Sequence, residues 1–156
     1  MAMPEPDRLY IVEADREARY DKIRGRGSPM YGQPTKVVFL LAMLKGRALN
    51  RFPELGPKRD GLVRSSYLQP RDKALIYAVA VAHTGSLDVL MDKKKTFEIA
   101  ERYAAGGIQP LMEEVFDERD ATNFERRLEL QTRELLSKIK LQELPEDPIP
   151  REPSRT

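Results

Sequence analysis

The chain has 156 residues, of which 40% are hydrophobic and 33% are charged, and it contains no cysteine. This length suits one domain with a real core, and the lack of cysteine excludes disulfides and thiolate metal sites. The longest apolar run, Val37 to Leu44, is far shorter than the roughly 20 residues that a membrane span needs. No secretory signal is visible at the N-terminus, so we expect a cytoplasmic protein with no membrane partner.

The net charge of +2 hides two oppositely charged halves. Residues 16–73 hold 14 Lys and Arg against 5 Asp and Glu, whereas residues 96–156 hold 9 against 14. Such asymmetry favours an anionic partner for the first half, or pairing of the two halves within the fold or across a homo-oligomer. The sequence leaves these alternatives open.

The first elements are a short apolar stretch and a helix. Residues 1–14 are predicted to form an N-terminal arm, and its apolar part, Leu9 to Val12, fits either a lone edge strand or the start of a helix. Helix formers fill residues 15–24, where Asp15 can cap the helix N-terminus. Three glycines and a proline then break the pattern between residues 25 and 33.

Two apolar helices are predicted in the centre of the chain. The first begins at Pro34-Thr35 and is apolar nearly all round, so we expect it in the core, with Gly46 interrupting or ending it. The second begins at Pro70 and ends at the His83-Thr84-Gly85 break. Residues 50–70 hold three prolines and two glycines, which predicts a long, irregular, basic connection.

Three more helices are predicted in the second half. Asp92 is a suitable N-cap for a helix that runs to about Ala104 and ends at Gly106-Gly107. A short helix over residues 108–116 follows, and the longest helix is expected over residues 121–141. Its apolar stripe is more typical of a core-facing helix than of a coiled-coil seam.

Together these segments predict an all-α fold class. We expect one compact domain of about five or six helices over residues 15–141, preceded by the arm, to which residues 9–12 could add a short N-terminal strand. Four prolines among charged residues predict a disordered tail over residues 142–156.

The sequence offers few residues for catalysis. His83 is the only histidine, which excludes a multi-histidine metal site, and no nucleophile motif accompanies it. We expect its imidazole to bond backbone or water at the helix end, and a hydrolase that uses it is the least favoured alternative. Glu114 and Glu118 share a helix face but lack companion ligands, so they are expected to be solvated. The sequence therefore predicts no catalytic residue, no metal, no cofactor and no enzyme.

Basic side chains near the centre of the chain are the strongest candidates for binding. They suit phosphate contacts, because each neutralised phosphate releases counterions. No base-reading motif is present, so the DNA binding they predict is sequence-nonspecific; the alternative is a solvated or protein-contacting surface. The predicted nucleic-acid contacts are Lys45, Arg47, Arg51, Lys58, Arg59 and Arg64. Lys93 to Lys95 also stand at a predicted helix start, where the macrodipole disfavours cations, which indicates an anionic neighbour.

Three segments carry a family resemblance. Residues 34–39 lead an apolar helix, Thr84-Gly85 closes the next one, and the most distinctive part is Glu101-Arg102-Tyr103-Ala104-Ala105-Gly106-Gly107-Ile108, followed by Leu111. Together they resemble the small Dnd-system-associated proteins found beside bacterial DNA phosphorothioation and restriction genes, which show a similar tyrosine–alanine–x–glycine–glycine–aliphatic signature. The resemblance covers roughly residues 34–115, and Ala105 stands where asparagine is expected. It implies a defence context and carries no catalytic motif.

Two functions follow as hypotheses. The first is a non-catalytic accessory component of a bacterial DNA-modification or anti-phage defence system, which docks onto a larger protein through the long helix and the acidic half. The second is a small, sequence-nonspecific module that binds double-stranded DNA through the basic segment 45–64.

Overall fold

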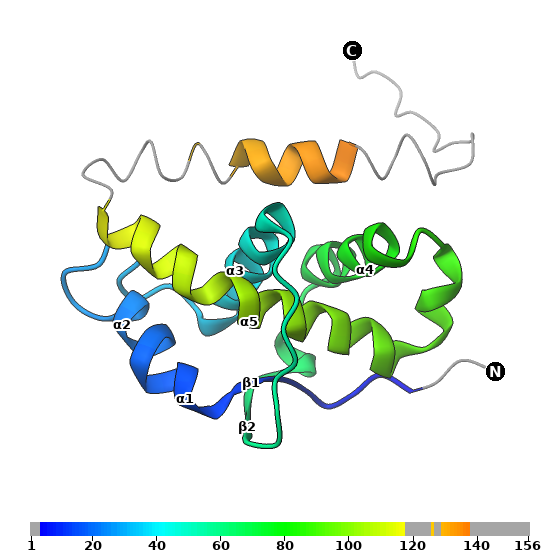
Figure 1. The fold of residues 1–156 in the computed structure, drawn as a ribbon, viewed down its shortest axis with the longest axis horizontal. Helices are drawn as coiled ribbons and strands as arrows, with labels where there is room; N and C mark the ends of the chain where they lie inside the picture. The colour runs from blue at the N-terminus through cyan, green and yellow to red at the C-terminus, as the bar shows by residue number, and fades with distance from the viewer. Residues whose placement is uncertain (1–3, 118–125, 127–128, 138–156) are drawn as a thin grey trace, which may run out of the picture.

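The computed structural model describes residues 4–117, 126 and 129–137. These residues form a mostly helical protein with one short two-stranded sheet. In the view of Figure 1, α3 and α4 lie above the long helix α5, and the sheet and the N-terminal helical turns lie below it. The elements in chain order are β1 Arg8–Val12, α1 Glu13–Asp15, the π-helical turn η1 Arg16–Tyr20, α2 Asp21–Arg24, α3 Thr35–Leu49, β2 Arg59–Arg64, the 3-10 turn η2 Ser65–Tyr67, α4 Pro70–Thr84, the 3-10 turn η3 Leu87–Met91 and α5 Lys93–Asp117.

The apolar N-terminal stretch is a strand with a partner. β1 pairs antiparallel with β2, with Leu9 opposite Val63 and an irregularity in register before Tyr10. Leu9 and Ile11 are fully buried, so β1 belongs to the domain that was predicted to begin at residue 15. Two predictions are therefore corrected: the strand is not alone, and residues 50–70 are not irregular throughout.

The two central helices begin where the sequence predicts. α3 starts at Thr35, directly after Pro34, and continues past Gly46 to Leu49. It ends at Asn50, whose left-handed φ of 57° terminates the helix. Gly46 therefore does not interrupt α3. Its role lies in the packing of α3 against α5.

The predicted start and end of α4 and the predicted N-cap of α5 are also confirmed. Pro70 is the first residue of α4, and Gln69 and Asp72 form a capping box at its start. Gly85 ends the helix with a φ of 77°, a conformation that glycine adopts without strain. At the start of α5, the Asp92 carboxylate accepts a hydrogen bond from the Lys95 amide at 3.1 Å.

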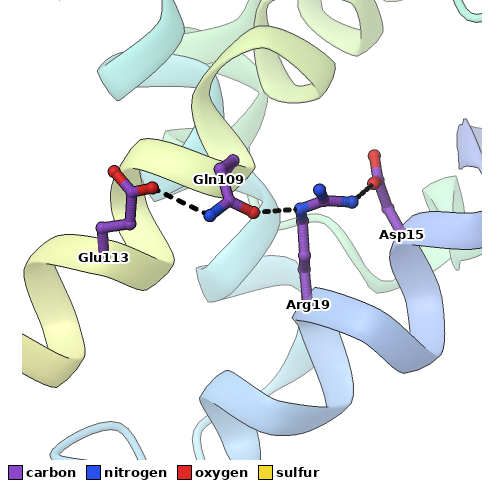
Figure 2. Close-up of polar contacts among 4 residues, drawn as sticks. All are labelled: Asp15, Arg19, Gln109 and Glu113. Atoms are coloured by element: carbon purple, nitrogen blue, oxygen red, sulfur yellow. Dashed lines mark hydrogen bonds and ion pairs between the residues drawn. The ribbon is translucent and has the colours of Figure 1, made fainter.

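The first helical segment is continuous from α1 through η1 to α2, and Asp15 lies inside it. The Asp15 side chain is therefore not an N-cap. It accepts a hydrogen bond from Arg19, whose Nε donates to Gln109 on α5, and the Gln109 amide donates to Glu113 at 2.9 Å. Figure 2 shows these four side chains in line between the two segments. This polar chain ties the N-terminal helical turns to α5.

The most informative correction concerns the glycine pair of α5. Gly106 and Gly107 do not end a helix, because α5 is one helix of 25 residues that also contains Pro110. A Cβ atom on Gly107 would overlap the carbonyl oxygen of Ala42, and one on Gly46 would overlap that of Tyr103. The two helices touch backbone to backbone at these positions. Glycine is needed here for its missing side chain, not for its backbone freedom.

One hydrophobic core draws on both strands and on η1, α2, α3, α4, η3 and α5. Its largest fully buried side chains include Tyr20, Phe39, Phe97 and Tyr103. Of the helix predicted over residues 121–141, residue 126 and residues 129–137 are described, and they are helical; Leu135 packs against the core. The predicted tail over 142–156 lies outside the described residues. Among the described helices, none combines the length and the apolar character needed to span a membrane.

Candidate functional site

Lys45, the first of the six predicted nucleic-acid contacts, points into the fold. Its Nζ lies 2.6 Å from Oε1 of Glu114, and each of the two side chains is only 13% exposed. This ion pair links α3 to α5. Lys45 is therefore engaged within the fold, and Glu114 is not the solvated surface group that its sequence context indicated.

Three more of the predicted contacts, Lys58, Arg59 and Arg64, lie on or next to β2 and are exposed. Arg59 Nε donates to the Gly56 carbonyl at 2.9 Å, and Arg64 sits opposite Arg8 across the sheet. We call residues 58–64 the charged ribbon. It is not purely basic, because its Asp60 forms an ion pair with Arg16 at 2.6 Å.

Arg47 belongs to a different cluster, centred on His83. The Arg47 guanidinium donates to the Tyr103 hydroxyl at 3.3 Å, and this hydroxyl lies 2.7 Å from Nδ1 of His83. The three residues come from α3, α5 and the last turn of α4. His83 is therefore bonded to a side chain from another helix, which corrects the prediction of a backbone or water partner.

Aromatic contacts hold the His83 ring in place. The Phe52 ring centroid lies 4.3 Å from that of His83 and 4.6 Å from that of Tyr103. Arg102 in turn stacks on Phe52, with its guanidinium carbon 3.9 Å from the ring centroid, and donates to the carbonyls of Phe52 and Pro53 at 3.1 Å. The segment after α3 is thereby fixed to α5, and it carries Phe52 onto His83.

The surroundings of His83 are positively charged. Partial burial lowers the pKa of its imidazole, and the nearby charges of Arg47, Arg102 and Lys95 lower it further. None of these three cations forms an ion pair with a carboxylate in the part of the chain that the structure describes. We call Arg47, His83, Lys95 and Arg102 the cationic His83 face.

Arg51, the remaining predicted contact, follows directly after α3 and is exposed. Its backbone packs against Gly106, where a Cβ atom would overlap the Arg51 carbonyl oxygen. The structure thus divides the predicted segment 45–64 into three parts. Lys45 forms an internal ion pair, residues 58–64 form the charged ribbon, and Arg47 and Phe52 belong to the cluster around His83.

A polar pocket shares Arg102 with this face. It encloses about 180 Å³ and is lined by Glu54, Leu55, Arg59, Glu98, Glu101 and Arg102. Glu101 is only 6% exposed, and its Oε2 accepts a hydrogen bond from the Tyr10 amide at 2.9 Å. This bond joins β1 to α5.

Burial raises the pKa of Glu101 to about 7, although the Tyr10 amide and the charge of Arg59 act in the opposite direction. The group therefore exchanges its proton near neutral pH. The Glu101 carboxylate also accepts the hydrogen bond that joins β1 to α5, so a change in its protonation first affects the contact between the sheet and α5. Among the described residues, no group of three or more acidic or histidine side chains is arranged to hold a metal ion.

Sequence reasoning missed Phe52, Arg102 and Tyr103 as parts of one cluster. A signal was present for two of them, because Arg102 and Tyr103 belong to the distinctive stretch 101–108. Within that stretch, Glu101 bonds β1, Arg102 holds the segment after α3, Tyr103 bonds His83 and the glycines contact α3. Each of these positions thus has a physical reason for its residue type.

The chain matches no protein-family model, no curated protein and no solved structure. The resemblance to Dnd-system-associated proteins thus stays a prediction from the motif.

Proposed function

We propose that this protein is a non-catalytic accessory component of a bacterial DNA-modification or anti-phage defence system, and that it contacts the phosphate backbone of double-stranded DNA through the cationic His83 face. The observation that carries the proposal is that Arg47 is linked to His83 through the Tyr103 hydroxyl and Arg102 through the Phe52 ring. The charge of Lys95 adds to theirs in lowering the pKa of His83, and none of the three cations has a carboxylate partner among the described residues. Phosphate is the partner that such a group of hydrogen-bond donors fits best.

Preorganisation supports this role. Arg47 and Arg102 are held by hydrogen bonds to Tyr103 and to backbone carbonyls, so little side-chain freedom remains to be lost on binding. Contacts to the phosphate backbone of DNA depend on charge and not on base sequence, which agrees with the lack of a base-reading motif in this protein.

The His83 face is a better candidate than the ribbon around β2. A carboxylate lies within the ribbon itself, because Asp60 is part of β2 and pairs with Arg16. A phosphate that approaches the ribbon therefore meets negative charge as well as positive charge, which weakens its attraction.

The proposed cellular context rests on the resemblance and on composition. The motif supports a defence-system component, and the cysteine-free composition supports a cytoplasmic setting. A larger protein of the same system is the partner that the motif implies.

The test is the salt dependence of binding to fluorescent duplex DNA. The logarithm of the binding constant falls linearly with the logarithm of the salt concentration, by about 0.9 per phosphate neutralised. The double variant Arg47→Gln/Lys95→Gln should bind more weakly and should flatten this slope by about 2.

A matched control removes the same charge from the ribbon. The double variant Lys58→Gln/Arg64→Gln changes two exposed cations outside the His83 face and should leave the slope unchanged. If the control flattens the slope and the first variant does not, the ribbon is the contact. If the unaltered protein does not bind DNA even at low salt, the proposal fails.

A further inference from the structure

The two nitrogens of the His83 ring have different surroundings. Nδ1 lies 2.7 Å from the Tyr103 hydroxyl, which also receives a hydrogen bond from Arg47 at 3.3 Å. A guanidinium group only donates, so the Tyr103 oxygen is the acceptor in the second bond. The direction of that bond helps to fix the direction of the first.

Tyr103 is 1% exposed, and a buried hydroxyl needs an acceptor for its proton. The acceptor that the structure provides for it is Nδ1 of His83. Nδ1 therefore carries no proton, and the neutral ring holds its proton on Nε2.

The neighbours of the ring favour the same state. Arg47, Arg102 and Lys95 disfavour a positive charge on the imidazole, so a second proton on Nδ1 is opposed. Phe52 and Tyr103 pack against the ring at centroid distances of 4.3 and 5.4 Å and hold its orientation. His83 is exposed to solvent even though Nδ1 is occupied, and no described residue accepts a hydrogen bond from Nε2, so Nε2–H is the donor that the ring offers to a ligand.

We infer that His83 is a ligand for a phosphate oxygen: Tyr103 fixes its tautomer, its Nε2–H donates to the oxygen, and the guanidinium groups held at Tyr103 and Phe52, those of Arg47 and Arg102, attract the anion. This inference rests on the proposed function and adds to it the residue and the atom that receive the phosphate. The same chemistry serves a DNA phosphodiester and a small free anion such as pyrophosphate, so the two sources need separate tests.

The experiment follows the imidazole nitrogens by NMR in the full chain labelled with ¹⁵N-histidine. His83 is the only histidine, so each signal has one assignment. In the free protein the shifts should report a bare Nδ1 and a protonated Nε2. Tyr103→Phe removes the hydroxyl that fixes the tautomer, and should give a mixture of the two tautomers.

Pyrophosphate and a short DNA duplex are then added separately. Each should shift the Nε2 signal and raise the pKa of His83, because a bound anion favours the imidazolium. His83→Ala should lower the affinity for each probe about tenfold, which is the effect expected from the loss of one hydrogen bond to a charged group. His83→Gln, which keeps an N–H donor at the place of Nε2, should retain most of the affinity.

The outcomes separate the two proposals. If DNA binds while the His83 signals and the affinity of His83→Ala stay unchanged, the phosphate ligand is wrong and DNA binding stands. If pyrophosphate shifts His83 and DNA does not bind, the phosphate ligand stands and the DNA proposal fails. A protonated Nδ1 in the free protein, or no response to either probe, overturns the inference.

Discussion

The contact between α3 and α5 is built differently in its middle and at its end. In the middle, Gly46 and Gly107 bring the two backbones together with no side chain between them. At the end, Arg47 of α3 reaches the Tyr103 hydroxyl and the polar surroundings of His83. Gly46 and Arg47 are neighbours in the sequence, but consecutive helical residues point about 100° apart, so one faces α5 and the other reaches the surface.

This difference shows how one pair of helices serves two purposes. The middle of the contact has no room for an added atom, so it determines stability. The end consists of long side chains at the surface, where a change of charge costs the fold little. Stability and binding should therefore respond to different substitutions only one residue apart.

The largest effect is expected from Gly46→Ala. The new Cβ would overlap the Tyr103 carbonyl, and because this obstacle is backbone, the helices must separate. We expect the free energy of unfolding to fall by about 3 kcal/mol, measured by urea denaturation. In the control Gly61→Ala, the nearest atom is the flexible end of the Arg8 side chain, so the loss should be below about 1 kcal/mol. Equal stability of the two variants would contradict the backbone contact.

A second effect, which depends on pH, is expected at Glu101, where α5 contacts β1. Burial raises the pKa of this carboxyl in the folded state to about 7 from 4.5, so the folded state holds the proton more tightly than the unfolded chain. The stabilisation is then complete below pH 4.5 and is lost as the pH rises through about 7.

Glu101→Gln removes this titration and keeps an oxygen that can accept from the Tyr10 amide. Compared with this variant, the unaltered protein should lose about 3 kcal/mol of stability between pH 4 and pH 9, measured by urea denaturation at each pH. The comparison cancels the other titrating groups. Parallel pH profiles for the two proteins would show that Glu101 titrates normally.

The smallest effect on stability is expected from Arg47→Gln. The side chain is partly exposed and has one long hydrogen bond to Tyr103, so the free energy of unfolding should change by less than about 1 kcal/mol. Its thermal midpoint should stay close to that of the unaltered protein, in contrast to Gly46→Ala. A loss as large as that of Gly46→Ala would mean that the end of the contact is as structural as its middle.

Local chemistry was sufficient for the starts of the main helices. Pro34, Pro70 and Asp92 mark the beginnings of α3, α4 and α5, and Gly85 marks the end of α4, because caps and prolines act on backbone groups a few residues away. The apolar character of α3 likewise placed it in the core.

Other features were decided only by contacts between distant residues. β2 has little strand character of its own and exists by pairing with β1, and the glycines of α5 were misread as a helix end because their reason lies in α3. The same holds for the candidate site. The charges of Lys45 and Arg47 look alike in the sequence, yet Glu114 takes one into the fold, while Tyr103 holds the other beside His83. Which cation is free to bind thus depends on carboxylates and hydroxyls more than 50 residues away along the chain, and only the tertiary structure brings them together.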